Sequence, residues 1–165
     1  MKRLLRGFLP ILLGATLAGT TLVACGPAKK SVFPPTLSIQ QLTVLPNGQW
    51  RLTLRIQNNS YGEMDFKSLE GQLQIGALAP IRLHSTVARD IPELAGDVLP
   101  LDVLPTGPMV QALQAVAGKG SAGSVAYLIK GSILAKPEQE KQVRDFDFDG
   151  NGWISPVPGI PNTWR

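Results

Sequence analysis

The chain has 165 residues, with 16 lysines and arginines, 12 aspartates and glutamates, and one cysteine. The length predicts a single domain with a modest hydrophobic core. Lys2, Arg3 and Arg6 lie within the first 24 residues, so that three of the 16 basic residues fall there and 13 remain to face 12 acidic ones. This near-neutral balance gives no electrostatic reason to expect a nucleic-acid partner.

The first 24 residues are organised like a lipoprotein signal peptide. A basic stretch precedes the apolar segment FLPILLGATLAGTT, and Leu22-Val23-Ala24-Cys25 follows. The apolar run is short and only weakly hydrophobic for a membrane span, but its length is typical of a secretory signal. Leu22, Val23, Ala24 and Cys25 resemble the lipobox of bacterial lipoproteins, in which the cysteine sulfur carries a lipid and cleavage leaves that cysteine first. The alternative is a plain secretory signal.

The resemblance to a lipobox implies a cell-envelope protein whose membrane partner is reached through a lipid on Cys25. Gly26 is not the aspartate that retains many lipoproteins at the inner membrane, which implies the periplasmic face of the outer membrane. Because the only thiol is used for the lipid, we expect no disulfide and no thiol chemistry in the mature chain. Residues 25–35 contain three prolines and little that could pack, and they predict a flexible tether.

Period-two alternation begins at Thr36. From Trp50 to Gln57 apolar and polar residues alternate without a fault, which predicts a strand with one buried face. Pro46-Asn47-Gly48 is a turn sequence that would join this strand to residues 36–44 in a hairpin. The apolar phase changes at Gln40-Gln41, where a bulge would restore the face.

Further alternation predicts five more strands. They are residues 69–75, 81–87, 99–103, 125–133 and 141–148. Residues 76–80 would join the first two in a second hairpin, and Pro100 marks its strand as an edge strand. Gly131 suggests a further bulge.

One segment has helical spacing instead, because Met109, Leu113 and Val116 recur on one face of residues 108–117. Pro108 suits the first turn of a helix and Gly118 its C-cap. Together these elements predict an all-β, immunoglobulin/fibronectin-like antiparallel β-sandwich of about seven strands with one short helix.

The order of these elements resembles the late embryogenesis abundant type 2 family, also called the WHy (water stress and hypersensitive response) domain, over residues 36–158. Asn58-Asn59-Ser60 stands where that family usually has an Asn-Pro-Asn corner. Gly131 matches a glycine of its penultimate strand, and residues 152–156 resemble its closing turn. Residues 159–165 would then be a C-terminal tail.

The resemblance implies a stress-protective or interaction module, acting during desiccation or other water stress, without catalysis or a cofactor. The alternative is a periplasmic carrier of an apolar or lipid ligand, bound between the sheets. We expect a monomer. The side chains of Asn58 and Asn59 can bond to nearby backbone, which predicts a structural corner and not a ligand site.

The stretch DFDFDGNGWISPVP matches part of a calcium-binding loop. Counted from Asp147, however, position 12 is Pro158, where such a loop needs a bidentate carboxylate. Residues 149–152 instead predict a hairpin turn. Asp145, Asp147 and Asp149 are then solvated acids, candidates for only a weak calcium contact, and a carboxylate pair for glycosidic chemistry is disfavoured.

Nucleophilic catalysis is not indicated either. His84, the only histidine, falls on the wet phase of its strand, whereas the adjacent Ser85 faces the other way. Of Trp50, Trp153 and Trp164, one is expected in the core.

Overall fold

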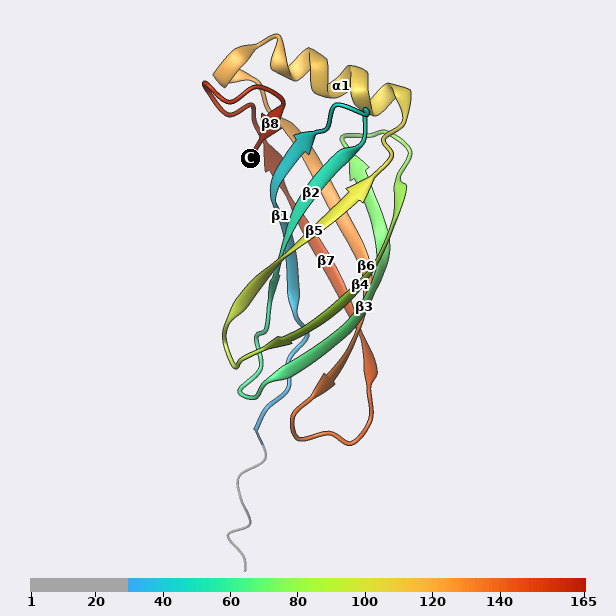
Figure 1. Cartoon of the computed structure of the whole chain (residues 1–165), viewed down its shortest axis with the longest axis vertical. Helices are drawn as coiled ribbons and strands as arrows, with labels where there is room; N and C mark the ends of the chain where they lie inside the picture. Colours follow the sequence, from blue (N-terminus) through green and yellow to red (C-terminus); the bar gives the residue numbers. More distant parts are fainter. Residues whose placement is uncertain (1–29) are drawn as a thin grey trace, which may run out of the picture.

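The computed structural model describes residues 30–165, which form two four-stranded antiparallel sheets with one helix across one end (Figure 1). The strand order is β5-β2-β1-β8 in one sheet and β4-β3-β6-β7 in the other. The predicted all-β sandwich is therefore confirmed, with eight strands. Their bounds are β1 Thr36–Val44, β2 Trp50–Gln57, β3 Met64–Ile75, β4 Ile81–Ile91, β5 Gly96–Val103, β6 Val125–Pro137, β7 Arg144–Ile154 and β8 Thr163–Trp164.

The first hairpin follows the sequence pattern closely. All four apolar residues of β2 are buried, led by Trp50, and β1 pairs with β2 along its whole length. The register shifts between Ile39 and Gln41, which confirms the predicted bulge. Gly48 in the connecting turn has a φ of 80°, a conformation that favours glycine.

The second hairpin, β3–β4, is also confirmed, although both strands are longer than predicted. β3 begins at Met64, and a second bulge between Phe66 and Ser68 keeps Met64 and Phe66 on the buried face. β5 is an edge strand, as Pro100 predicted.

Gly131 does not form the predicted bulge. β6 keeps an unbroken register with β7 at this point, and Gly131 pairs with Gly71 of β3. A Cβ atom added to Gly131 would lie 2.1 Å from the backbone oxygen of Glu70. The glycine is therefore explained by the close approach of the neighbouring strand.

The predicted turn at residues 149–152 is wrong as well. These residues continue β7, and each pairs with a residue of β6. A Cβ atom on Gly150 would lie 2.1 Å from the backbone oxygen of Leu37 in β1. The glycine thus lets β7 of one sheet pass close to β1 of the other.

Residues 159–165 are not a tail. Thr163–Trp164 form β8 and pair with Leu42 and Thr43 of β1. Trp164 is only 6% exposed, so its burial holds the end of the chain on the sheet. Two of the three tryptophans, Trp50 and Trp164, belong to the core, whereas Trp153 is 69% exposed.

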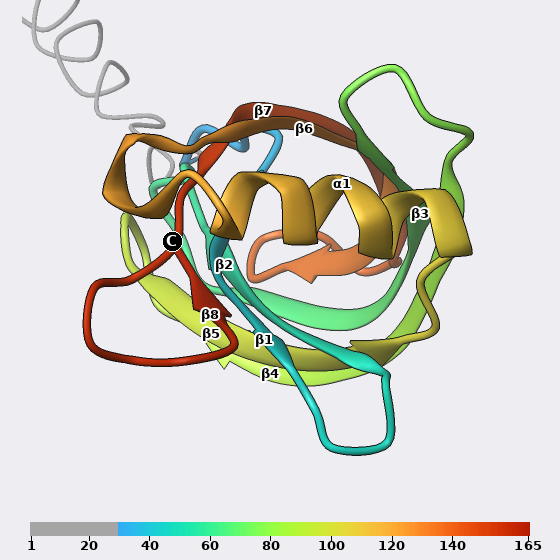
Figure 2. The same ribbon diagram turned by 90° about the horizontal axis from the view of Figure 1, so that it is seen from above.

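The helix α1, Gly107–Ala117, lies across one end of the sandwich (Figure 2). It buries Met109, Leu113 and Val116, as the spacing predicted, and Gly118 caps its end. A short 3₁₀ turn, Gly120–Ala122, follows and leads into β6. None of the helices in residues 30–165 is long and apolar enough to cross a membrane.

Candidate functional site

The predicted lipid-attachment residue Cys25 and the recognition residues Leu22, Val23 and Ala24 lie outside the described residues. What the structure describes is the entry of the chain into the domain, at the end of the sandwich opposite α1 (Figure 1). Here residues 30–35 are bonded to the β2–β3 loop and are not the free tether that was expected. Tyr61 N donates to Ser31 O (3.1 Å), and Phe33 N donates to Ser60 Oγ (2.9 Å). Asn59 Nδ2 donates to Pro34 O (2.9 Å).

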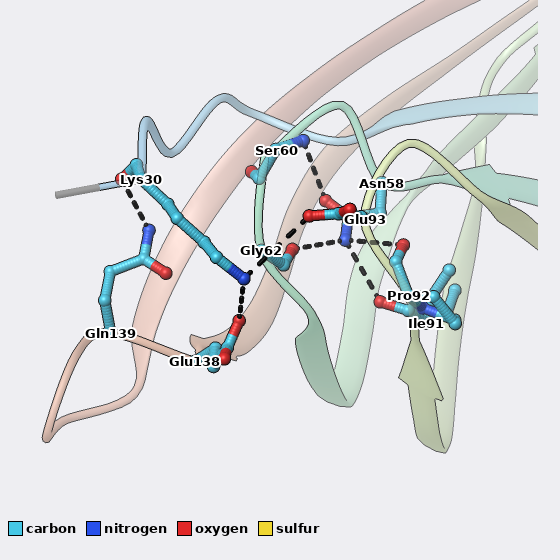
Figure 3. Close-up of polar contacts among 9 residues, drawn as sticks. All are labelled: Lys30, Asn58, Ser60, Gly62, Ile91, Pro92, Glu93, Glu138 and Gln139. Carbon is cyan, nitrogen blue, oxygen red and sulfur yellow. Dashed lines mark hydrogen bonds and ion pairs between the residues drawn. The ribbon is translucent and has the colours of Figure 1, made fainter. Parts of the chain in front are cut away.

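Lys30 links this segment to two more loops (Figure 3). Its Nζ lies 3.0 Å from Glu138 Oε2 and 3.9 Å from Glu93 Oε2, and Gln139 Nε2 donates to Lys30 O at 2.8 Å. The hydrogen bond with Glu138 raises the pKa of Lys30, and the same bond lowers the pKa of Glu138. Both side chains are exposed, so the pair positions the segment without contributing much stability.

Asn58 occupies the corner next to this segment and is fully buried. Its Nδ2 lies within 3.0 Å of three backbone oxygens, those of Gly62, Ile91 and Pro92, and its Oδ1 accepts from Ser60 N at 2.9 Å (Figure 3). One amide therefore ties the β2–β3 loop to the β4–β5 loop. All its polar atoms are used within the protein, which leaves none to hold a ligand.

The acidic stretch of β7 lies on the outer face of its sheet. Asp145, Asp147 and Asp149 are all exposed and alternate with the buried Phe146 and Phe148. Neighbouring aspartates are two residues apart on an extended strand, so that their Cα atoms lie about 6.6 Å apart. Within residues 30–165, no three histidine, cysteine or acidic side chains come together as metal ligands.

The outer face of this sheet also carries a shallow polar groove of about 860 Å³. Gly71 and Gly131 lie at its floor, and two rows of side chains cross the strands beside them. The rows are Arg82, Gln72, Lys130 and Asp149, then His84, Glu70, Ser132 and Asp147. The charges alternate from one strand to the next, with a cation on β4 and β6 and acids on β3 and β7. The groove therefore has no single sign of charge that would select an anion or a cation.

His84 belongs to this groove and is exposed, as predicted. Its Nδ1 lies 3.5 Å from Glu70 Oε1, and both side chains are more than 70% exposed. Ser85 instead donates to Thr86 O at 3.2 Å. The Ser85 hydroxyl is therefore bonded to backbone and not to the imidazole.

A smaller pocket of about 250 Å³ lies at the other end, beneath α1. Trp50 and Trp164 line it from the sheet, and Val110, Leu113 and Ala117 line it from the helix. Both indole N–H groups are buried, and neither has a hydrogen-bond partner within the described part of the chain. A buried donor without a partner costs about 1–3 kcal/mol.

Sequence reasoning did not find this pocket. Its walls come from the β1–β2 hairpin, α1 and the C-terminal segment, which are far apart along the chain. Trp164 was the one available signal, since an aromatic residue of this size at the end of a small domain is seldom left in water.

No protein-family model and no curated protein sequence matches this chain. Among solved structures, a crystal structure of a protein from Archaeoglobus fulgidus is similar, with a TM-score of 0.39 and 6% identity over 77% of this chain and 100% of that one. The solution structure of AT1g01470 from Arabidopsis thaliana gives a TM-score of 0.43 and 9% identity over 88% and 93% of the two chains. At these scores the similarities carry no argument about function.

Proposed function

We propose that this protein is a non-catalytic β-sandwich held on a membrane by a lipid on Cys25, where it acts as a stress-protective or interaction module. The observation that carries the proposal is the fixed entry of the chain at one end of the sandwich. Lys30 is five positions after Cys25, so the Cα atoms of the two residues can lie at most about 18 Å apart. A lipid on Cys25 would therefore keep the entry end, with Lys30 and the Asn58 corner, close to the bilayer.

The outer faces of both sheets suit such a role. Arg51 and Arg55 on one sheet, and Glu70, Gln72 and Arg82 on the other, present mixed charges and amides to solvent. Such surfaces hold water without favouring one charged partner. A domain of this kind, concentrated at a membrane, would act where loss of water does early damage.

The anchoring is tested by fractionation of cells. Cys25→Ala should release the protein from the membrane fraction or leave an unprocessed precursor, whereas the wild type should incorporate labelled palmitate. Unchanged fractionation of the variant, with palmitate still incorporated, would contradict the anchor.

The protective role is tested with the purified domain and with a deletion strain. We expect deletion to lower survival of drying or osmotic shock more than it alters any metabolic activity. The domain should also limit freeze–thaw aggregation of a test enzyme better than an equal mass of an unrelated β-sandwich. Equal protection by both sandwiches would reject the protective role.

A second candidate function, the carrying of an apolar ligand, is favoured by the pocket beneath α1. Its walls are largely apolar and it contains no charged side chain. Native mass spectrometry of the protein purified from its own envelope would detect a bound molecule, and a spectrum with the bare protein mass alone would count against this candidate.

A further inference from the structure

The entry end of the domain exposes three large apolar side chains, which we call the entry patch. Phe33 is 45% exposed, Tyr61 54% and Leu94 57%. They come from three separate segments, namely the incoming chain, the β2–β3 loop and the β4–β5 loop. Large apolar side chains that are gathered in water at one end of a domain are typical of a surface that contacts another molecule.

Ser60 joins the three segments of the entry patch. Phe33 N donates to Ser60 Oγ (2.9 Å), which in turn donates to Phe33 O (3.1 Å), and Leu94 N donates to Ser60 O (3.2 Å). Tyr61 is the next residue, and its ring lies edge-on to that of Phe33 with 6.1 Å between the ring centroids. Ser60 is only 1% exposed, so the polar groups that join the segments are buried while the apolar side chains stay in water.

The backbone of Leu94 is a second, independent observation. Its φ is 54°, a left-handed conformation that costs a leucine energy. The side chain gains little burial in return, because more than half of it is exposed. Glycine or asparagine would suit this turn better on grounds of stability alone. A strained leucine in water indicates that its side chain makes a contact outside the domain.

The charges around the entry patch do not favour an anionic partner. The incoming chain and the three loops at this end carry more acidic than basic residues. The acidic ones are Glu63, Glu93, Glu138 and Glu140, and the basic ones are Lys30 and Lys141. Lys30 lies 3.0 Å from Glu138 and 3.9 Å from Glu93, so its charge is already paired within the protein. The surface therefore offers apolar contact without attraction to negative charge.

We propose that the entry patch is a second membrane contact, in which Phe33, Tyr61 and Leu94 lie between the headgroups and the acyl chains of neutral phospholipids. The inference rests on the proposed anchor, because a lipid on Cys25 would bring a bilayer to this same end of the sandwich (Figure 1). Tyr61 suits this region, since its ring is apolar and its hydroxyl is polar. Stable attachment to a membrane takes two signals, and the patch adds one to the lipid and fixes the orientation of the domain.

The test uses the full chain purified from its cell envelope and reconstituted in phosphatidylcholine vesicles. The acyl chains of the lipid carry bromine, which quenches tryptophan fluorescence only at short range. The native tryptophans are the reference, because Trp50 and Trp164 lie beneath α1 and Trp153 is near the α1 end of β7. We expect Tyr61→Trp to add emission that the bromine quenches by at least about half. Leu104→Trp, at an exposed site between β5 and α1, should add emission that is not quenched.

Leu94→Asn separates the membrane contact from folding. Asparagine tolerates the left-handed backbone here, so urea denaturation should find the variant at least as stable as the wild type. In the Tyr61→Trp chain, however, Leu94→Asn should lower the quenching at least about twofold, because the patch loses one of its apolar side chains. Leu104→Asn is the matched control, since it removes a leucine that is 74% exposed at the opposite end and should leave the quenching unchanged.

The anchor and the patch fail in different ways. Mass spectrometry of the purified chain shows whether Cys25 carries a lipid, and a chain without one overturns both the anchor and this inference. If the lipidated Tyr61→Trp chain is not quenched, or if Leu94→Asn and Leu104→Asn have the same effect on the quenching, the anchor stands and the inference is overturned. Quenching that appears only after phosphatidylglycerol is added would show an electrostatic contact and would overturn the apolar one proposed here.

Discussion

Asn58 concentrates more hydrogen bonds than any neighbouring side chain at the entry end of the domain. Its amide nitrogen contacts three backbone oxygens, its amide oxygen accepts from Ser60 N, and the side chain is fully buried. Removal of this side chain would leave all of these backbone groups without a partner at once. Asn58 is therefore expected to contribute more to stability than its size suggests.

We therefore expect Asn58→Ala to lower the free energy of unfolding by at least about 2 kcal/mol, since buried backbone groups would be left unpaired. Asn59→Ala is the matched control, because Asn59 donates a single bond to Pro34 O and should cost less than about 1 kcal/mol. Urea denaturation measures both. Equal losses would mean that the Asn58 network is not what holds the corner.

Gly131 is a second position at which the neighbouring backbone restricts which residue fits. Gly131→Ala would place a methyl group 2.1 Å from a backbone oxygen, and backbone cannot move aside as a flexible side chain can. We expect a loss of at least about 2 kcal/mol. Gly118→Ala, with right-handed backbone and no atom nearer than 3.6 Å, should stay within about 1 kcal/mol of the wild type. Thermal unfolding that ranks the two variants in the opposite order would refute this explanation.

At the scale of elements, β8 and β7 show how edge strands complete the two sheets. β8 has only two residues, but it covers part of the edge of β1 and carries the buried Trp164. β7 passes close to the N-terminal part of β1, where Gly150 allows the approach to Leu37. Tyr127 supports the same junction, because Ile39 N donates to its hydroxyl oxygen at 3.1 Å. β1 is thus contacted by β8 in its own sheet and by β6 and β7 of the other sheet.

If β8 is part of the core, Trp164→Ala should lower the free energy of unfolding by about 3–5 kcal/mol, as removal of a large buried aromatic side chain does. Trp153→Ala makes the same chemical change on the exposed face of β7 and should alter stability by about 0.5 kcal/mol or less. Urea denaturation followed by circular dichroism compares the two. A Trp164 variant as stable as the Trp153 variant would restore the view of residues 159–165 as a tail.

At the scale of the whole molecule, the sandwich has two chemically different ends. At one end, residues 30–35 are held by hydrogen bonds and by the Lys30–Glu138 ion pair. The other end carries α1 and the apolar pocket. A lipid near the first end would direct the pocket away from the membrane surface. The proposed anchor and the proposed ligand site therefore do not compete for space.

The ion pair at the entry end predicts a pH dependence. Because the pKa of Glu138 is lowered in the folded protein, the contribution of the pair is present above the ordinary pKa of a glutamate and is lost as the pH falls through the folded value. The raised pKa of Lys30 gives the opposite pH dependence. Its contribution to stability is present below the ordinary pKa of a lysine and is lost as the pH rises through the folded value. The entry segment should be held most firmly between these limits.

The amide signal of Tyr61, which donates to Ser31 O, reports on this segment. In the wild type the chemical shift of this amide should change as the pH falls through the lowered pKa of Glu138. In Glu138→Gln the chemical shift should stay constant over the same pH range. Glu93→Gln, which removes the longer 3.9 Å contact, should leave the titration nearly unchanged. A wild-type curve that coincides with that of Glu138→Gln would show that the pair does not hold the segment.

Much of the fold was determined by the sequence itself. Four features are local patterns, because each depends on residues that are close together in the sequence. They are the alternation in β2, the turn at Gly48, the bulge beside Gln41 and the apolar face of α1. Local geometry decides which side chains share a face, so a single sequence is enough to read it.

The tertiary structure decided the rest, in each case through contacts between distant residues. Residues 149–152 have the composition of a turn but stay extended, because β6 pairs with them and Gly150 meets Leu37. Trp164 is buried by β1, more than 100 residues earlier, and residues 30–35 are held by loops that follow β2 and β6. The pocket beneath α1 exists only where three such segments converge. Long-range packing of this kind leaves no periodic signal in the sequence, which is why the local patterns located the strands but not the candidate site.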